Sequence, residues 1–324
     1  MPMLVNLGKI GLSNGDVFLI SAHKVTNAGS ITAPNGSAEL AAGHQVTLLV
    51  SDALHIGVLR ATGTATRDGH VWLVANTGAV DARGATIISR HADGTPADVD
   101  MQGKAVRLGN TTVDANNWTL TAGDFAADVA TAATLGANLN RGVSITVNAI
   151  GPDGKFGATG AGDIAVQSDV RWSGASALTF NASHSLSIAP RVSIANVGSG
   201  SLVLAADTSG FDKGGSVINR GTIDWSKSRG IVSAFYDMNG RYARGIVRTN
   251  PSWRPAPFSG VRTQFTAYTL VNSIDDLRAI KTDLAGTYAL GRSLELTNTS
   301  DVANIGTAAN PFTGQFFGNG HLLG

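Results

Sequence analysis

Residues 14–49 of this chain read NGDVFLISAHKVTNAGSITAPNGSAELAAGHQVTLL. Short apolar alternations recur in this stretch, separated by a few Gly, Asn, Pro or Ser residues, and they are Val17–Leu19, Val25, Ile31, Ala38–Leu40 and Val46–Leu48. Alternation with a period of two is typical of a strand that has one buried face. The breaks are too short to hold a helix, and most lack the Asn-Gly dipeptide of a tight hairpin. The stretch therefore predicts a chain that coils around one axis in short strands.

Two patterns from this stretch return later in the chain. The six-residue shape Gly-x-Val-x-Leu-x occurs at 15–20 and 69–74 and returns, with Leu in place of Val, at 200–205. The run Val-x-Asn-x-Gly-Ser-Ile at 25–31 is matched by Val-x-Asn-x-Gly-Thr-Ile at 217–223. Asn and Gly suit bends, where positive φ or a side-chain bond to the backbone is needed, and Asn at stacked bends can form amide ladders.

The spacing of the alternating segments indicates a solenoid. Segments that begin at Val143, Ile164 and Leu186 are 21 and 22 residues apart, and Leu178 is 24 residues before Leu202. A coil of two or three short strands takes roughly 20 to 30 residues, so about ten to twelve coils are expected before residue 245. Stacked strands of this kind run parallel and bury their inward side chains only against neighbouring coils. The fold class predicted is an all-β, right-handed parallel β-helix.

Three regions are expected along the chain. Residues 1–245 form the β-helix shaft. Residues 246–272 contain three prolines within 251–257 beside several aromatic residues, and because proline removes ladder donors this region is predicted to be a connector or cap. Residues 273–324 are expected to hold one short helix near residues 273–285, with Ser273 as its N-cap, and then further strands.

Composition favours an exported repetitive β protein. Charged residues make up 15% of the chain, Gly is 40 of 324 residues, and Cys is absent. The net charge of +1 offers no electrostatic reason to expect a nucleic acid or an acidic membrane as partner. No apolar run approaches the ~18 residues that a membrane-spanning helix needs. Residues 1–6 lack the features of a signal peptide, so the sequence is interpreted as a piece of a longer protein.

A family resemblance rests on two groups of residues. The runs 25–31, 33–36 (Ala-Pro-Asn-Gly) and 40–43 (Leu-Ala-Ala-Gly) resemble a passage of the filamentous-haemagglutinin-like exoproteins of two-partner secretion systems, which belong to the adhesins. Residues 311–321, PFTGQFFGNGH, resemble the GLUG repeat of the same large surface proteins. The resemblance implies a secreted protein of the bacterial outer surface, an outer-membrane two-partner transporter as one partner, and a receptor or glycan of a host or neighbouring cell as another.

Signals for catalysis or metal binding are few, and each has a simpler structural interpretation. Gly11–Gly15 matches G-x-S-x-G, but a strand follows it where a nucleophile elbow needs a helix. Asp98 with Asp100, and Asp275 with Asp276, are carboxylate pairs without a partner that would separate their pKa values. Residues 160–164, GAGDI, faintly resemble a calcium-binding coil but do not repeat. The seven histidines show no metal-binding spacing and are His23, His44, His55, His70, His91, His184 and His321.

The sequence therefore predicts a structural and binding protein, not an enzyme: an adhesin-like stalk for cell-surface attachment. No catalytic residue, cofactor or metal is predicted, ligand-binding residues stay unknown, and neither a nucleic-acid partner nor a membrane span is expected. Two alternatives remain. The chain could be the stalk of a secreted toxin or contact-dependent inhibition protein. It could also be a polysaccharide-degrading β-helix enzyme, which would require charged groups clustered on one face of neighbouring coils. The outward or inward orientation of Trp72 and Trp172 is left open.

Overall fold

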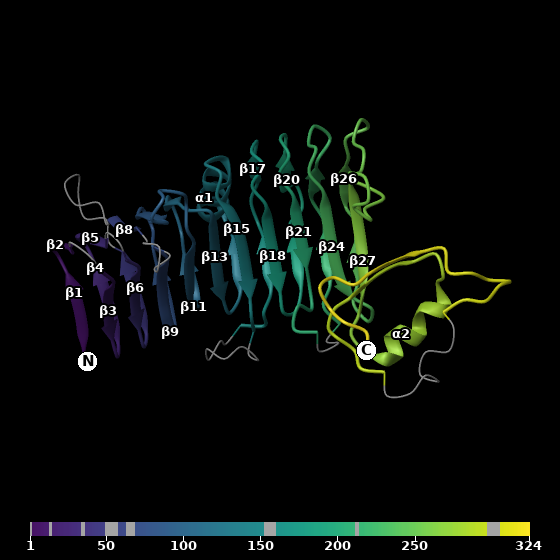
Figure 1. The fold of residues 1–324 in the computed structure, drawn as a ribbon, viewed down its shortest axis with the longest axis horizontal. Helices are drawn as coiled ribbons and strands as arrows, with labels where there is room; N and C mark the ends of the chain where they lie inside the picture. The colour runs from purple at the N-terminus through teal and green to yellow at the C-terminus, as the bar shows by residue number, and fades with distance from the viewer. Residues whose placement is uncertain are drawn as a thin grey trace.

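The chain folds into a parallel β-helix whose coils stack along the long axis of the molecule, as a computed structural model shows (Figure 1). The structure describes residues 2–12, 15–33, 36–48, 58–62, 69–151, 160–210, 214–296 and 305–324. The strands of neighbouring coils lie side by side from the N-terminal end of the shaft to the module that carries α2 (Figure 1). The all-β parallel β-helix predicted from the sequence is confirmed.

Four sheets line the shaft, and every pairing between their strands is parallel. The longest sheet, called the long sheet below, runs β1 (Met3–Asn6), β4 (Lys24–Asn27), β7 (Gln45–Leu48), β9 (Val71–Asp81), β11 (Val99–Arg107), β13 (Asn117–Ala122), β15 (Ser144–Ala149), β18 (Leu178–Ala182), β21 (Leu202–Ala205), β24 (Val232–Asp237), β27 (Phe265–Val271), β28 (Thr287–Leu290) and β29 (Gln315–Phe317), with β3 (Val17–Ser21) and β6 (Ala38–Ala42) paired beside β9. A second sheet runs β12 (Thr112–Asp114), β10 (Thr86–Arg90), β8 (Val58–Thr62), β5 (Ser30–Ala33) and β2 (Lys9–Gly11). A third runs β14 (Phe125–Ala127), β16 (Ile164–Val166), β19 (Leu186–Ile188), β22 (Val217–Asn219) and β25 (Tyr242–Ala243), and a fourth runs β17 (Val170–Trp172), β20 (Ser193–Asn196), β23 (Thr222–Asp224) and β26 (Ile246–Arg248).

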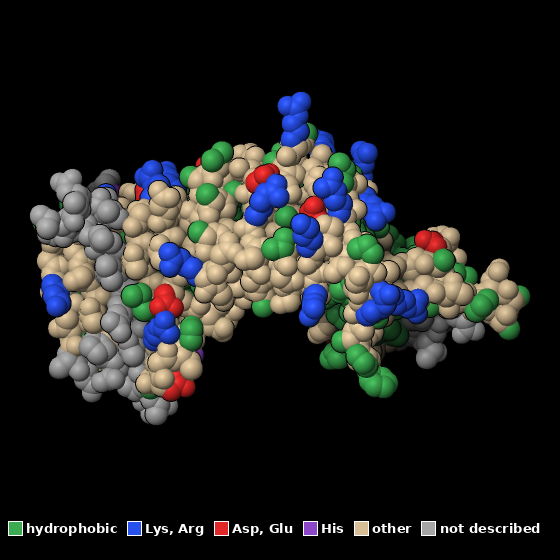
Figure 2. All heavy atoms as spheres, turned by 90° about the horizontal axis from the view of Figure 1, so that it is seen from above, with side chains coloured by type: hydrophobic (Ala, Val, Ile, Leu, Met, Phe, Trp, Pro, Cys, Tyr) green, Lys and Arg blue, Asp and Glu red, His purple; other side chains and the backbone are tan. Residues whose placement is uncertain are grey.

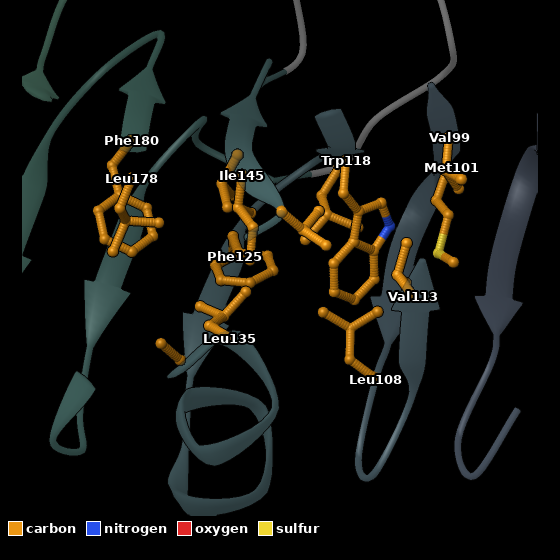
Figure 3. Packing of buried hydrophobic residues seen from close by; sticks show 14 of the residues in the cluster. Val99, Met101, Leu108, Val113, Trp118, Phe125, Leu135, Ile145, Leu178 and Phe180 are labelled. Atoms are coloured by element: carbon orange, nitrogen blue, oxygen red, sulfur yellow. The ribbon is translucent and has the colours of Figure 1, made fainter. Parts of the chain in front are cut away.

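Inward side chains of the long sheet stack in columns along the axis. One column contains Val17, Ala38, Val71, Val99, Trp118, Ile145, Leu178, Leu202, Val232 and Phe265. Figure 3 shows part of this core, where Trp118, Ile145 and Leu178 come from successive strands. Full burial of such an aliphatic side chain is worth about 1.5–3 kcal/mol. Each coil gains this stabilisation only from its neighbours, which explains why the structure is a continuous stack.

The predicted coil spacing is partly wrong. Leu178 pairs with Leu202, and Ile164 pairs with Leu186, as the spacings of 24 and 22 residues require. Val143 is not in this register, because it leads into β15 of the long sheet whereas Ile164 belongs to β16 of the third sheet. The distance between equivalent residues varies from 19 residues, Val99 to Trp118, to 33, Ala38 to Val71. Bends of unequal length therefore place nine members of the column before residue 245, fewer than the ten to twelve coils expected.

The repeated Asn-x-Gly bends lie where the backbones of neighbouring coils nearly touch. The Asn219 side chain is buried and accepts a hydrogen bond from the Gly221 backbone nitrogen at 2.9 Å. A Cβ on Gly221 would lie 2.2 Å from the Val192 carbonyl oxygen, so this position requires glycine. Asn27 also bonds within its bend, and it forms a two-residue amide ladder with Asn6 at 2.8 Å.

Helix α1 (Val129–Asn140) was not predicted, and it interrupts the stack of strands. It contacts β12 on one side and β17 on the other, so it stands between the second and fourth sheets. The Asp128 side chain caps its first turn by accepting from the Thr131 backbone nitrogen. Ala, Thr, Gly and Asn make up most of the helix, and several of these are weak helix formers, which explains why the sequence did not indicate it.

The parallel sheets continue beyond residue 245, where the shaft was expected to end. β26 pairs with β23, and β27 pairs with β24, whereas the proline-containing segment 249–264 between them has no strand. The predicted short helix is present as α2 (Ile274–Ala279) followed by one 3₁₀ turn (Ile280–Thr282), and Ser273 and Asp276 form a capping box at its start. β29, in the GLUG-like residues, adds one more parallel strand to β28.

Candidate functional site

The outer face of the long sheet carries two columns of partly exposed side chains. The first column contains Phe18, Glu39, Trp72, Asp100, Thr119, Thr146, Thr179, Val203, Ser233 and Thr266. The second contains Ile20, Ala41, Val74, Gln102, Thr121, Asn148, Asn181, Ala205, Phe235 and Tyr268. The strand spacing of about 4.8 Å makes these columns regular arrays along the shaft.

In the middle of this face, three adjacent strands present only hydroxyl and amide groups. β13, β15 and β18 contribute the neutral lattice, which comprises Thr119, Thr121, Thr146, Asn148, Thr179 and Asn181. The Asn181 Nδ2 donates to Asn148 Oδ1 at 3.0 Å, and the Asn148 Nδ2 donates to Thr121 Oγ1 at 3.5 Å. These bonds fix the amide orientations along the column. The hydroxyls and the remaining amide atoms are left available to a ligand that offers many hydroxyl groups.

A rigid aromatic cluster borders the neutral lattice on its N-terminal side. The His70 ring stacks on Trp72 with centroids 3.9 Å apart and planes 3° from parallel. The His70 Nε2 lies 2.6 Å from Asp100 Oδ2. Burial raises the pKa of Asp100, but hydrogen bonds from His70 and Thr119 and the charge of His70 outweigh burial and bring the pKa below its usual value. Asp100 is therefore an anion that holds the His70 ring against the indole.

An apolar hollow borders the lattice on its C-terminal side. It has a volume of about 230 Å³ and opens beside Asn181, with Val203, Ala205 and Phe235 in its wall. The Phe235 ring stacks on Tyr268 at 5.0 Å with planes 11° from parallel. Burial raises the pKa of Tyr268, so its hydroxyl stays protonated at neutral pH. The outer face thus offers a neutral polar strip between two aromatic borders.

A second hollow brings charged groups together at the bend that follows the long sheet. It has a volume of about 550 Å³, and its lining includes His44, Lys104, Arg107 and Asp124. The Asp124 Oδ1 accepts hydrogen bonds from the backbone nitrogens of Gly162 at 2.8 Å and Asp163 at 3.0 Å. Asp124 is the one carboxylate in this lining, and its hydrogen bonds serve a bend.

The structure assigns structural contacts to the carboxylates that the sequence singled out. Asp98 accepts from the backbone and side chain of Asn117, and Asp163 contacts His184 at 2.6 Å. Asp276 accepts from the backbone nitrogens of Asn272 and Ser273. The predicted carboxylate pairs therefore stabilise bends and the start of α2.

The other sequence candidates also have plain positions. Within the described residues, no group of three or more His, Asp or Glu side chains could hold a metal ion. His23 stacks on His44 of the next coil at 5.2 Å. Ser13 of the G-x-S-x-G match and His55 lie outside the described residues.

The tryptophans divide between the inside and the outside of the shaft. Trp118, Trp172 and Trp225 are at most 3% exposed and lie in the core. Trp72 lies on the outer face, so the orientation left open for Trp72 and Trp172 differs between the two. The indole nitrogens of Trp172 and Trp225 donate to the carbonyls of Ser176 and Gly200, which satisfies them inside the core.

The neutral lattice was missed in the sequence, although a signal for it exists. Thr-x-Thr at 119–121 is followed by Thr-x-Asn at 146–148 and again at 179–181, each on one side of a strand. The His70–Asp100 contact had no signal, because the two residues meet only through the register of β11 on β9.

Comparison with known proteins found no match among family models, curated proteins or solved structures. No helix within the described ranges is long and apolar enough to cross a membrane.

Proposed function

We propose that this chain is an adhesin-like stalk of a secreted bacterial surface protein, and that the neutral lattice of the long sheet contacts a glycan of a host or neighbouring cell. The observation that carries this proposal is the run of three strands that expose hydroxyl and amide groups without any charge. A neutral glycan offers hydroxyl groups that can exchange hydrogen bonds with such an array. The resemblance to filamentous-haemagglutinin-like exoproteins supports the same assignment.

The borders of the lattice suit a glycan in addition. Sugar rings have apolar faces, and the Trp72 ring and the wall at Phe235 provide apolar surface at the two ends of the polar strip. Because the coils form a continuous stack, the strip is held on a stiff support. Stiffness lowers the conformational cost of binding a long, repetitive ligand.

The export route follows from the resemblance and from the architecture. A two-partner transporter passes an extended chain, and a parallel coil can add to the end of a stack that is already folded. Folding outside the membrane, one coil after another, would then make export unidirectional without ATP. The absence of cysteine in the sequence agrees with this route, because no disulfide can close before passage.

Binding of the fluorescently labelled full chain to epithelial cells tests this proposal. We expect binding that falls when cell-surface glycans are oxidised with periodate, and that falls further with Asn148→Leu and Asn181→Leu together. Ser187→Leu, on the exposed face of β19, is the matched control and should bind like the original chain. Binding that survives both periodate and the double substitution would rule out the lattice as the contact surface.

A second candidate function is degradation of a polysaccharide in the charged hollow. Lys104, Arg107 and Asp124 meet the condition that charged groups of neighbouring coils share one hollow. Hydrolysis by the usual mechanism needs two carboxyl groups about 5–9.5 Å apart, and the lining offers one. Incubation with neutral and acidic polysaccharides, followed by measurement of new reducing ends, distinguishes the candidates. Turnover that Asp124→Asn abolishes would favour the enzyme.

A further inference from the structure

The near-neutral total charge conceals a strongly basic segment close to the C-terminal module. Residues 214–272 contain eight Lys or Arg and two Asp, a formal charge of +6, whereas residues 69–151 contain five Lys or Arg and seven Asp, a formal charge of −2. All eight basic side chains are exposed, and Figure 2 shows Lys and Arg gathered over this half of the shaft. Of the two carboxylates, Asp237 is fully buried and Asp224 is paired with Arg248.

Apolar side chains protrude within this basic surface. Segment 249–264, called the docking loop below, carries Phe258, whose relative exposure of 107% is the largest among the apolar residues that the structure describes as exposed. Phe258 has φ of +59°, a backbone region that bulky L residues rarely adopt. Phe316 and Phe317 of β29 are 37% and 44% exposed and share a hollow of about 580 Å³ with Arg262.

The docking loop is held firmly at its base. The Asn250 backbone nitrogen donates to Gln264 Oε1 at 2.7 Å, and the Gln264 Nε2 donates to the carbonyls of Ser228 and Gly230. The Trp253 indole donates to the carbonyl of Arg229 at 3.1 Å. Three prolines further restrict the loop. A fixed base keeps Phe258 exposed, so burial of its ring requires a partner.

We infer that the docking loop and the adjoining basic bend, Lys227 with Arg229, bind the surface of an anionic phospholipid bilayer. Exposed Trp and Phe amid Arg and Lys form the composition of interfacial membrane-binding segments, in which the rings enter the headgroup region and the cations meet anionic lipid. A nucleic acid would satisfy the cations but would offer the isolated Phe258 side chain no hydrocarbon. The inference is independent of the glycan contact proposed above, which involves a different face.

Sedimentation of the full chain with vesicles tests the inference. We expect binding to vesicles that contain phosphatidylglycerol, weaker binding at high salt, and none to pure phosphatidylcholine. Arg262→Gln should weaken the affinity roughly fivefold, the contribution of one cation at an anionic surface. Phe258→Gly should weaken it about tenfold or more, as expected for a ring that leaves hydrocarbon. Glycine accepts the positive φ, so this variant keeps the fold.

Two matched controls lie on the opposite half of the shaft. Arg141→Gln removes one exposed cation beside α1, and Val129→Ser removes an exposed apolar side chain that is 75% accessible. Both should bind vesicles like the original chain. The inference is overturned if the chain ignores anionic vesicles, if the control variants lose as much affinity as the loop variants, or if duplex DNA is bound at the same salt concentration while vesicles are not.

Discussion

The Asn138 side chain of α1 accepts a hydrogen bond from the backbone nitrogen of Val113 at 2.8 Å. Its Nδ2 donates to the carbonyl of Thr111 at 2.9 Å, so one amide satisfies two backbone groups at the edge of β12. A helix has no free backbone groups in its middle to pair with a strand. Asn138 therefore replaces the ladder bonds that are lost where α1 interrupts the stack.

Asn138→Ala should lower the free energy of unfolding by about 2–4 kcal/mol, because it leaves buried backbone groups of β12 without partners. Val129→Ala, on the exposed side of the same helix, should change the stability by less than about 0.5 kcal/mol. Urea unfolding followed by circular dichroism measures both. Equal effects of the two substitutions would show that the edge of β12 does not depend on Asn138.

Gly221→Ala should destabilise the shaft by about 3 kcal/mol, near the upper end of overpacking effects, because the new Cβ meets the Val192 carbonyl and neither backbone can move freely. Gly109 offers a matched control, since a Cβ there meets its nearest atom at an ordinary 3.5 Å. The thermal unfolding midpoints of the two alanine variants give the comparison. A Gly221→Ala protein as stable as Gly109→Ala would contradict the close approach of the coils.

Trp118→Phe should cost about 1–3 kcal/mol less stability than Trp225→Phe. Both indoles are buried, but the Trp225 Nε1 donates to Gly200, whereas the Trp118 Nε1 has no hydrogen-bond partner in the described part of the chain. Phenylalanine removes an unsatisfied donor in the first case and leaves an unpaired carbonyl in the second. Denaturant titration of the two variants decides this, and the reverse order would place a partner beside Trp118.

Asp81 should contribute stability that acid removes. Burial raises the pKa of Asp81, and the hydrogen bonds and charges of Arg83, together with the charge of Arg107, bring it below the usual value. Because the folded state has the lower pKa, the contribution is fully present above about pH 4, the unfolded pKa, and is lost as pH falls through the folded pKa.

Unfolding of the original chain and of Asp81→Asn, measured at several pH values between about 6 and 2, tests this dependence. The stability difference between the two proteins should be largest near neutrality and shrink below about pH 4. A difference that stays constant with pH would mean that Asp81 does not titrate differently on folding.

Most of the strands could be predicted from the sequence because their signal is local. Val17 and Leu19 alternate with polar or exposed neighbours, and the same alternation at Leu178 and Leu202 marks equivalent strands. The Asn27 and Asn219 bends were also predictable, since Asn and Gly serve the backbone of their own bend. Features that each coil must repeat are thus visible in one sequence.

The remaining features depend on contacts between distant residues. Asn138 is a poor helix former when its sequence is considered alone, and its role appears only once β12 lies beside it. Likewise, Val143 was placed in the wrong column because a bend of unequal length changes the sheet that a spacing connects. The outer lattice and the basic segment share this origin, because register and local charge are not expressed by composition totals.

The central claim is that Thr146 and Thr179, 33 residues apart, lie side by side on parallel neighbouring strands. The chain contains no cysteine, so Thr146→Cys with Thr179→Cys introduces the two thiols needed for a test. Neighbouring strands are about 4.8 Å apart, within the range that a disulfide spans, whereas Thr146 and Val203 are separated by two such steps. Mild oxidation followed by mass measurement of blocked thiols should show a disulfide in the 146/179 variant and free thiols in a folded 146/203 variant. Free thiols in a folded 146/179 variant, or a disulfide in the 146/203 variant, would contradict the parallel stack.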